Sequence, residues 1–591
     1  MSDTRRLWRY AAQRRWLLAG IVVAALAGFP LQVVGIEASR RLVNAATAPQ
    51  GATLHALLCA GAALLTAAVF ANLAQALETD AQNRLSRAVC TDIRMDAFRH
   101  VLGLPVSYFD THNPREIIAR VEDDVSSIGT SVYQVWLYLA SSAVRIAVGL
   151  VGMFATDRRL ALLSLAFLPA TSIAGRLLAP QGRRTAASYR EYWSEYQTRL
   201  SDIIHGIREV IIYGQQAREA RRHRGRNEIL MARLLRNQRA LLGFSTVLVT
   251  LNEVMSRAVM VYGGYLAYTH HLAWGDVVAF MGYSGMITGP FSVVAAKWGA
   301  AQVGLASASR VFEVLDVPGM AADPGPRAPH CACRVAMQGT SFAYGPGEEV
   351  LRGVSLELRP GKVAALVGLS GAGKTTIASL LLRLYETNDA SIALNGVPYA
   401  ELDSGFVRSH FGYVPQEPYL FDGSVLENVS FGRDQEPDEG AVRAALGRAG
   451  ALSFVESLPG GLHAAVGPRG ATLSGGQAQR IGLARALFAG RPVLILDEAT
   501  SALDSEAESL VRLTCRELSR DHAVLVIGHR LSSIITADEI CVLRDGAVVE
   551  RGTHEDLMAS NGEYTKLFLS QARPEDLLRE WRSRWSAGGG H

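Results

Sequence analysis

The stretch from Gly368 to Thr375 carries the residue types that hold a polyphosphate. It reads Gly-Leu-Ser-Gly-Ala-Gly-Lys-Thr and fits the pattern G-x-x-x-x-G-K-[ST]. Glycines let backbone N–H groups approach phosphate oxygens, Lys374 can reach the outer phosphates, and a threonine hydroxyl can bind Mg²⁺. We therefore predict a nucleoside triphosphate site made by Gly368, Ser370, Gly371, Ala372, Gly373, Lys374, Thr375 and Thr376.

Two acids, Asp497 and Glu498, directly follow the apolar run Val493–Leu496. Next to a phosphate loop such acids have separate tasks. Asp497 can hold Mg²⁺ through water together with Thr375, and Glu498 can take a proton from the attacking water. A solvated Asp-Glu turn is the alternative, which the apolar residues before the pair disfavour. We expect Glu498 and Lys374 to act in catalysis.

A strand, a glycine loop and a helix must position these groups. Residues 363–367 are all apolar and predict a buried strand, and residues 376–384 predict a helix. Phosphates then lie at the N-terminus of a helix, where the helix dipole favours negative charge. From residue 334 to about 570, short β-like runs alternate with helical ones, which indicates a mixed α/β domain.

The composition of the 591 residues favours a membrane protein. Hydrophobic residues make up 49% and charged residues 19%, and the mean hydropathy is +0.14. The net charge of +4 gives no case for nucleic-acid binding. Apolar runs long enough for the roughly 20 residues of a membrane span lie at about 16–36, 54–77, 132–154, 160–179, 241–268 and 277–296.

Arginine positions predict the orientation of these six spans. Five arginines precede the first span, so the N-terminus should be cytosolic, and an even number of spans returns the chain to the cytosol. The connections 78–131 and 180–240 then lie in the cytosol as long helical rods. We predict a six-helix transmembrane domain at 1–317, a Pro/Gly-rich linker at 318–333, an α/β P-loop ATPase domain at 334–575 and a tail at 576–591.

Further motifs follow in an order that resembles the nucleotide-binding domain of ATP-binding cassette transporters. The pentapeptide Leu473-Ser474-Gly475-Gly476-Gln477 is the most specific of them. The resemblance implies that Tyr344 stacks on adenine, that Gln416 is a catalytic lever near Mg²⁺, and that His529 is a catalytic switch at the γ-phosphate. It also implies that Asp504 lies in a loop crossing to a partner, and that the ATP site is completed by another copy's Ser474, Gly475, Gly476 and Gln477.

Fused membrane and ATPase halves resemble the exporter branch of this family. That resemblance implies ATP hydrolysis coupled to transport, in a dimer with two composite sites, in the inner cell membrane. A homodimer is the simplest case, and a heterodimer stays open. Residues 104–110 and 211–220 are similar to the two cytosolic coupling loops. Where exporters usually have Gly-Glu-Arg-Gly, this chain has Gly467-Pro468-Arg469-Gly470, which alters that coupling contact.

Four ionisable residues in or near the spans are candidates for a cargo cavity, because buried charges in membranes usually serve function. Glu253 and Arg257 are four residues apart and can neutralise each other, which leaves Arg145 as the more exposed charge; Lys297 lies near the inner end of the last span. The cargo we expect is a small amphipathic molecule, a peptide or a peptide-derived metabolite. An exporter-like siderophore importer and a heterodimeric lipid or drug exporter are the alternatives.

Overall fold

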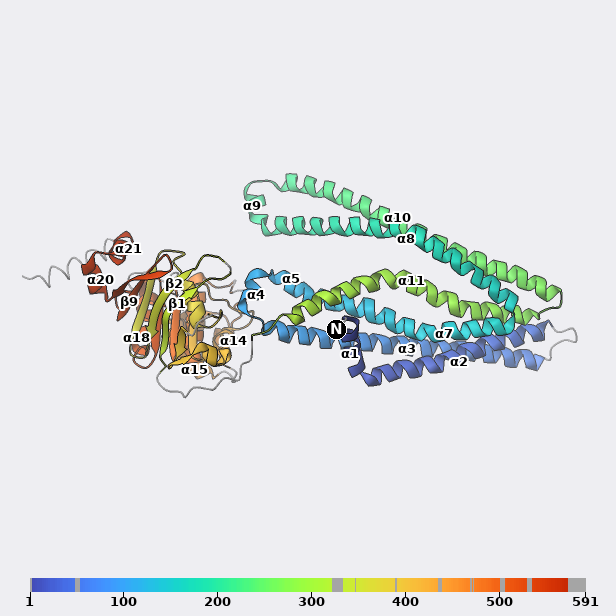
Figure 1. Ribbon diagram of the computed structural model, residues 1–591, viewed down its shortest axis with the longest axis horizontal. Helices are drawn as coiled ribbons and strands as arrows, with labels where there is room; N and C mark the ends of the chain where they lie inside the picture. Colours follow the sequence, from blue (N-terminus) through green and yellow to red (C-terminus); the bar gives the residue numbers. More distant parts are fainter. Residues whose placement is uncertain are drawn as a thin grey trace, which may run out of the picture. The chain divides into compact units, whose positions relative to one another are not determined.

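The computed structural model of the protein forms two units (Figure 1). It describes residues 3–47, 54–320, 333–345, 347–387, 391–433, 438–467, 470, 472–499, 505–528 and 534–571. The first unit contains Met1–Leu102 and Asn113–Val317, and the second contains Gly103–His112 and Pro318–His591. Most of the predicted linker, the Pro468-Arg469 pair and the tail lie outside the described residues.

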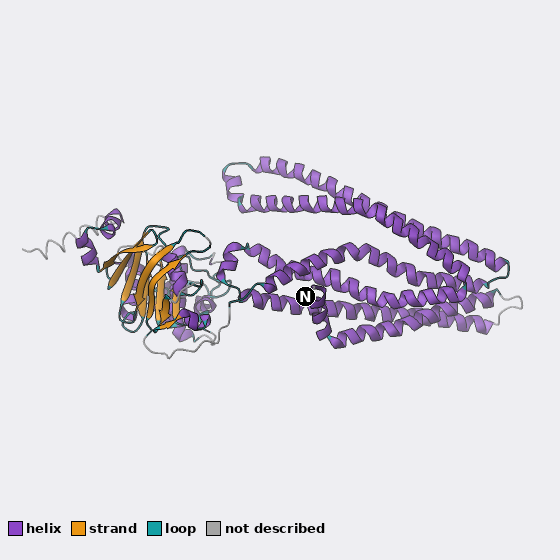
Figure 2. Cartoon of the chain, viewed as in Figure 1, coloured by secondary structure: helices purple, strands orange, loops and turns teal. Residues whose placement is uncertain are grey.

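The first unit is helical throughout its described residues (Figure 2). Its elements are α1 (Asp3–Gln13), α2 (Arg15–Ala46), α3 (Leu54–Leu102), α5 (Pro114–Ala119), the π-helical turn η1 (Arg120–Asp124), α6 (Val125–Ser127), the π-helical turn η2 (Ile128–Tyr133), α7 (Gln134–Thr156), α8 (Arg158–His205), α9 (Ile207–Ile212), α10 (Gln216–Tyr268) and α11 (Trp274–Asp316).

Each of the six predicted spans falls within or almost wholly within one long helix: α2, α3, α7, α8, α10 and α11. In the described residues, four helical stretches are long and apolar enough to cross a membrane: Arg15–Ala46, Leu54–Leu102, Pro114–Thr156 and Gln216–Tyr268. The count of six therefore stays a prediction. With 53 residues, α10 is about 80 Å long, well beyond a hydrocarbon core of about 30 Å. The helices α3, α8 and α10 thus continue beyond the predicted spans, whereas the connection 78–131 is interrupted between Leu102 and Pro114; the cytosolic placement of both connections stays a prediction.

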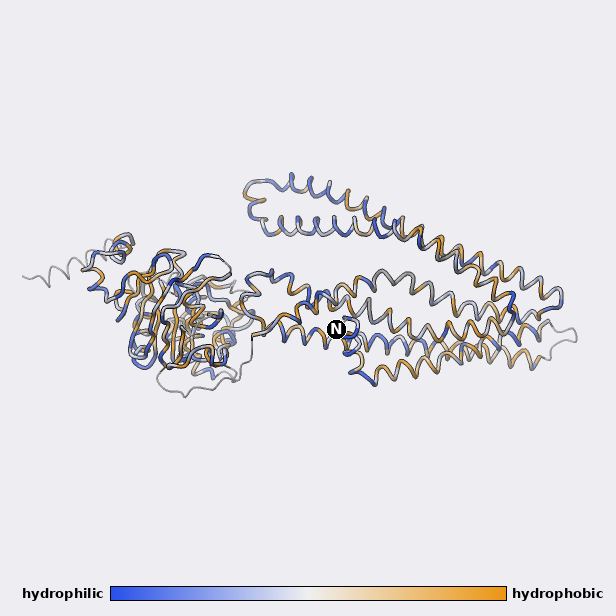
Figure 3. Tube along the Cα trace, viewed as in Figure 1, coloured by the Kyte–Doolittle hydropathy of each residue, from blue (hydrophilic) through white to orange (hydrophobic). Residues whose placement is uncertain are grey.

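The helices α8 and α10 form a hairpin closed by α9, and they pack along each other. Thr185 donates a hydrogen bond to the Asn237 side chain at 3.2 Å, and the Arg233 guanidinium lies 4.5 Å from the centre of the Tyr192 ring. Figure 3 shows that the hairpin is mainly hydrophilic next to α9 and more hydrophobic towards its other end. The polar end fits the predicted cytosolic rods, and the apolar end fits two spans.

Two π-helical turns interrupt the helix that leads into α7. At η2, a side chain on Gly129 would come 2.3 Å from the Cys90 sulfur, so only glycine permits this approach to α3. Ser86 donates to the Gly129 carbonyl at 2.8 Å and the Tyr133 hydroxyl donates to the Leu7 carbonyl at 2.7 Å. These contacts fix the rotation with which α7 begins.

The second unit contains two sheets. A six-stranded sheet has the order β10-β9-β3-β8-β7-β6, parallel except for β10, and a four-stranded antiparallel sheet has the order β2-β1-β4-β5. The strands are β1 (Val335–Phe342), β2 (Leu351–Leu358), β3 (Val363–Gly368), β4 (Ile392–Leu394), β5 (Val397–Pro398), β6 (Phe411–Val414), β7 (Val493–Asp497), β8 (Ala523–Ile527), β9 (Glu539–Arg544) and β10 (Ala547–Gly552).

Helices cover both faces of the six-stranded sheet. The helices described in the second unit are α4 (Val106–Thr111), α12 (Lys374–Leu381), η3 (Tyr399–Glu401), α13 (Ser404–Arg408), α14 (Val425–Ser430), α15 (Glu439–Arg448), α16 (Leu452–Ser457), η4 (Gly461–His463), α17 (Gly475–Ala489), α18 (Ser505–Leu518), α20 (His554–Ser560) and α21 (Glu563–Gln571). Consecutive residues of β3 enter different apolar clusters, Val363 and Ala365 on one face and Ala364 and Leu366 on the other. A parallel sheet buried on both faces explains the unbroken apolar runs of the sequence.

Candidate functional site

The glycine loop follows β3 as predicted and leads directly into α12. Every residue of β3 is buried, which anchors the loop at the carboxyl edge of the sheet. Gly371 has φ +83° and Gly373 has φ +102°, values that L side chains rarely adopt. A Cβ on Gly373 would also come 2.6 Å from Leu351. The positive φ angles and this close approach therefore define the curvature of the loop.

Lys374 lies across this loop. Its ammonium donates to the carbonyls of Gly368 at 2.8 Å and Leu369 at 3.0 Å. Burial lowers the pKa of Lys374, while the charges of Glu498 and Asp497 act in the opposite direction. The ammonium thus occupies an internal position from which it can exchange carbonyl contacts for phosphate contacts.

The two acids sit at the end of β7, close to the loop. Asp497 is 3% exposed, and the Tyr413 hydroxyl donates to it at 3.3 Å. Burial raises the pKa of Asp497, and hydrogen bonds from Tyr413 and Thr375 oppose that rise. Glu498 has φ +48°, and the Gln416 side chain donates to its carboxylate at 2.7 Å. The structure therefore brings Gln416 to Glu498 and Thr375 to Asp497.

The exposed faces of these groups fit a magnesium nucleotide. Ser370, Gly371 and Thr375 are exposed, and a Cβ on Gly371 would meet nothing within 4 Å, so open space borders the backbone of the loop. Hydroxyl and carboxylate oxygens at Thr375 and Asp497 are the hard donors that Mg²⁺ prefers. Ala372 is buried on the inner side, and Thr376 accepts a hydrogen bond from the Tyr344 hydroxyl at 3.0 Å.

Tyr344 lies beside the loop with its ring half exposed. It contacts Tyr385 edge to face, with ring centres 4.9 Å apart. The Tyr385 hydroxyl donates a hydrogen bond to Asp110 of α4, the helix formed by the segment similar to the first coupling loop. Sequence reasoning did not select Tyr385, because nothing local marks an aromatic residue that follows α12 as a partner of Asp110.

The signature pentapeptide forms the start of α17. Ser474 is the N-cap, its hydroxyl accepts from the Gln477 N–H at 3.3 Å, and the Gln477 side chain accepts from the Ser474 N–H at 2.8 Å. This reciprocal capping box leaves Gly475 and Gly476 at the first helical positions. Ser474 and Gln477 thus hydrogen-bond to each other within the N-terminal cap of α17.

The structure does not describe the side chains of three predicted site residues. His529 and Asp504 lie outside the described residues, and of Lys297 the backbone within α11 is described but the side chain is not.

In the first unit, Arg145 is not the exposed charge that the sequence suggested. It is 8% exposed, and its guanidinium donates to Glu78 of α3 at 2.8 Å. Glu78 is 3% exposed and also accepts from Gln82 at 3.0 Å. The guanidinium lies 5.5 Å from the Phe29 ring centre. Glu78 was overlooked because it follows the apolar run of the second span and looked like the start of the cytosolic rod.

Arg145 borders a cavity of about 460 Å³ between α2, α3, α7 and α11. Gln32, Asn72 and Ser39 are its other polar lining residues, and the rest of the wall is apolar. The Arg145 Nε is buried and has no hydrogen-bond partner among the described residues. The wall of this cavity is therefore mostly apolar, and Arg145 is the one charged side chain among its lining residues.

Glu253 and Arg257 pair with each other, at 3.2 Å, as the four-residue spacing predicted. They border a separate apolar hollow of about 1140 Å³ on α10, together with Tyr262 and Tyr265. Within one chain, the structure thus places Arg145 and the Glu253–Arg257 pair at two separate cavities.

Known proteins match both units. Family models for the ABC transporter transmembrane region and the ABC transporter match residues 18–291 and 351–501. An ATP-dependent lipid A-core flippase of Chromobacterium violaceum is 34% identical, covering 81% of this chain and 82% of that protein. A fatty acid ABC transporter ATP-binding/permease protein of Mycobacterium bovis is 34% identical, covering 84% and 79%.

The structure of a bacterial Atm1-family ABC exporter with ATP bound is similar over both units. It matches with a TM-score of 0.82 and 25% identity, covering 95% of this chain and 98% of that one. The α/β fold and the helical membrane unit predicted from sequence are confirmed. The chain belongs to the ATP-binding cassette transporters: it is a multi-pass membrane half-transporter that binds ATP with Mg²⁺ and couples its hydrolysis to export.

Proposed function

We propose that two copies of this chain form an exporter of an amphipathic, lipid-like molecule in the inner cell membrane. The observation that carries the cargo class is the mixed lining of the Arg145 cavity, where one arginine and three uncharged polar side chains interrupt an apolar wall. Such a lining suits a molecule with a polar head and an apolar body. Two relatives named for lipid A-core and fatty acid support this class, and neither is named for a peptide.

The Glu253–Arg257 pair supports the dimer. The side chains are 57% and 74% exposed in a single chain, although they lie in an apolar stretch of α10. Ionisable groups in a membrane nearly always face protein or a water-filled cavity, because lipid exposure is costly. A second copy covering this face of α10 removes that cost. The α8–α10 hairpin packs chiefly along itself within one chain and is free to provide this contact.

The ATP sites are proposed to be composite. The signature serine caps α17 within its own unit, while the glycine loop presents an open face. Ser474, Gly475, Gly476 and Gln477 of one copy would face Gly368–Thr376 of the other, with Asp504 at the crossing loop. This arrangement makes each ATP a bridge between two chains and couples nucleotide binding to closure of the two ATPase units.

Within each site we assign one task to each residue. Gly368, Ser370, Gly371, Ala372, Gly373 and Lys374 would hold the phosphates, Tyr344 would stack on the base, and Thr375 with Asp497 and Gln416 would hold Mg²⁺. Mg²⁺ supplies charge neutralisation when bound. The Gln416 amide orients Glu498, whose carboxylate takes the proton of the attacking water. His529 would contact the γ-phosphate.

Turnover in lipid nanodiscs tests the assignment of Glu498. Glu498→Gln keeps the shape and the hydrogen-bonding ability of the side chain but removes the proton acceptor, so hydrolysis should fall by about 10²-fold or more. Glu555→Gln, at an exposed acid of the same unit, is the matched control and should behave as wild type. Hydrolysis by Glu498→Gln at the wild-type rate refutes the assignment.

Transport in inverted membrane vesicles tests cargo class and direction. ATP-dependent uptake of a labelled lipid-like probe, absent in Glu498→Gln vesicles, is the expected result. Uptake of a hydrophilic peptide in preference to the lipid-like probe contradicts the cargo class. ATP-dependent accumulation in whole cells contradicts export. Native mass spectrometry of the purified chain should give a mass of two chains.

A further inference from the structure

Arg512 and Arg516 lie on one side of α18, and Arg520 follows in the turn after the helix ends at Leu518. The spacing of four residues places Arg512 and Arg516 on one helix face, where like charges repel and destabilise the helix. None of the three makes a salt bridge or a side-chain hydrogen bond within the described part of the chain. Arg512 is half-buried and Arg516 and Arg520 are exposed, so their guanidinium groups are available to an anion from outside the helix.

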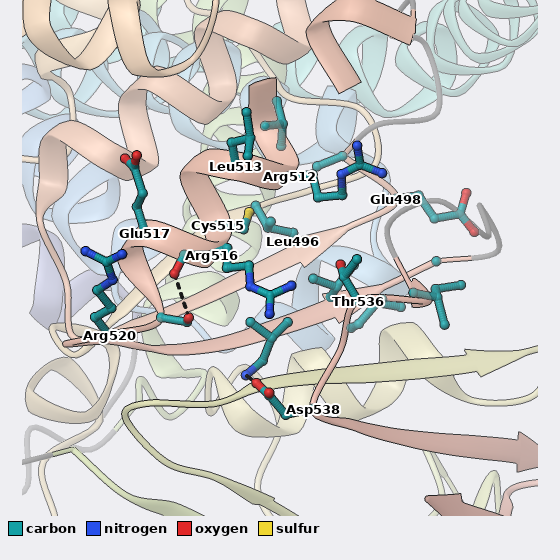
Figure 4. A pocket seen from close by; sticks show the side chains of 18 of the residues that line it. Leu496, Glu498, Arg512, Leu513, Cys515, Arg516, Glu517, Arg520, Thr536 and Asp538 are labelled. Carbon is teal, nitrogen blue, oxygen red and sulfur yellow. Dashed lines mark hydrogen bonds between the residues drawn. The ribbon is translucent and has the colours of Figure 1, made fainter. Parts of the chain in front are cut away.

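A cavity of about 500 Å³ lies under this face, between α18 and the carboxyl ends of β7 and β8. Glu498 and Gly528 border it at one end, and Thr536 and Asp538 border it from the segment before β9. Figure 4 shows that Arg512 and Arg516 extend towards the side where Glu498 and Thr536 lie. Arg520 lies at the other end, beside Glu517.

The acids that border the cavity are mostly engaged elsewhere. Asp538 accepts a hydrogen bond from the Val363 N–H at 2.7 Å, and Glu498 accepts one from Gln416 at 2.7 Å. Burial raises the pKa of the Cys515 thiol to about 12, so this residue adds no negative charge at neutral pH. Arg512 and Arg516 therefore give their part of the cavity a positive potential.

We propose that this cavity is a second anion site, at which Arg512 and Arg516 bind the inorganic phosphate that ATP hydrolysis releases. Paired guanidinium groups match phosphate oxygens with bidentate hydrogen bonds, and the Thr536 hydroxyl can add a third contact. The established activity supplies the ligand, and the proposed role of Glu498, on which this inference rests, places its release next to the cavity. The site would hold phosphate after it leaves the γ-position and would make turnover sensitive to phosphate concentration.

Phosphate binding to the full-length chain in nanodiscs tests this site without requiring hydrolysis. A non-hydrolysable ATP analogue with Mg²⁺ first fills the glycine loop, so that phosphate cannot bind there. Equilibrium dialysis with labelled phosphate, at constant ionic strength in chloride, then measures the remaining site. Wild type should bind one phosphate per chain saturably.

Two variants make the comparison specific. The double variant Arg512→Gln with Arg516→Gln should weaken phosphate binding about tenfold or more, since charge-assisted hydrogen bonds are lost. Arg520→Gln removes the same charge at the opposite end of the cavity, in the turn after α18, and its phosphate affinity should stay within roughly twofold of wild type. Unchanged binding of the ATP analogue shows that each variant is folded.

Three results overturn the proposal: no saturable phosphate binding in wild type, equal binding by the double variant, or tighter binding of glycerol phosphate than of inorganic phosphate. The last result would assign the cavity to a phosphorylated metabolite. Hydrolysis by Glu498→Gln is scored separately, so failure of the catalytic assignment and failure of the phosphate site are distinguishable.

Discussion

The buried pair of Arg145 and Glu78 gives a prediction that can be worked out from its geometry. At 2.8 Å and an effective dielectric constant of about 20, the attraction is roughly 6 kcal/mol. Part of it offsets the desolvation of two groups that are 8% and 3% exposed. Arg145→Gln alone leaves Glu78 charged and unpaired, and Glu78→Gln alone leaves Arg145 unpaired. Each should destabilise the membrane unit by about 3–5 kcal/mol.

The double variant Arg145→Gln with Glu78→Gln should be far less destabilised than the sum of the single variants. Two neutral amides can hydrogen-bond to each other, and neither leaves a buried charge. We expect a coupling energy of about 3 kcal/mol in a double-mutant cycle. Unfolding by SDS in mixed micelles, followed by the fluorescence of the membrane unit, measures each free energy of unfolding. Single-variant effects that add to within about 0.5 kcal/mol refute an energetically coupled pair.

The same cycle separates cargo binding from structural support. A loss of cargo-stimulated turnover in Arg145→Gln alone is ambiguous, because Glu78 is then an uncompensated charge beside the cavity. The double variant removes that charge. If it also loses cargo stimulation while keeping basal turnover, the Arg145 side chain contacts cargo. Wild-type stimulation in the double variant contradicts the proposed cargo contact.

Three further predictions concern the ATPase unit. Gly373→Ala should lower the free energy of unfolding by roughly 2–4 kcal/mol and Gly371→Ala by only about 1–2, as measured by chemical denaturation, because both have positive φ but only the former adds a close contact. The backbone N–H and, to a lesser extent, the hydroxyl of Ser424 donate to Glu427 and hold its pKa below the usual value, so the stability they contribute is present at neutral pH and lost as pH falls. Ser424→Ala keeps the N–H but removes the hydroxyl, so it should reduce this acid-dependent part of the unfolding curve, and an unchanged pH profile contradicts it. Tyr344→Ala should weaken ATP binding by about 1–3 kcal/mol in a fluorescence titration while Tyr344→Phe retains it, and equal affinities would remove the stacking role.

Local signals explain most of what the sequence predicted correctly. The buried strand at 363–367, the glycine loop and the acid pair are each set by a few consecutive residues, since strand burial and backbone φ are local properties. β3 and β7 pair in parallel with the two sides of β8, so their carboxyl ends lie at the same edge of the sheet. This topology alone places Lys374 and Asp497 in the same region of the unit.

Long-range partners were beyond sequence reasoning. Arg145 and Glu78 are 67 residues apart on different helices, and only the rotation of both helices decides that they meet. Helical periodicity fixes which residues share a face, but it does not say which neighbour that face contacts. The expectation that Arg145 is exposed failed for this reason. The Tyr385 and Asp110 contact has the same origin, since it joins a segment preceding α5 to the ATPase unit.

The π-helical turns η1 and η2 have a consequence for how this chain tolerates change in length. Each such turn accommodates an extra residue in a helix that otherwise advances about 100° per residue. Deleting one residue within η1 or η2 would restore regular α-helix at that turn, but would rotate all of α7 by about 100° relative to α3. Arg145 would then turn away from Glu78. A deletion that leaves the local helix regular would therefore break a charge pair that lies roughly three to four helical turns beyond η2.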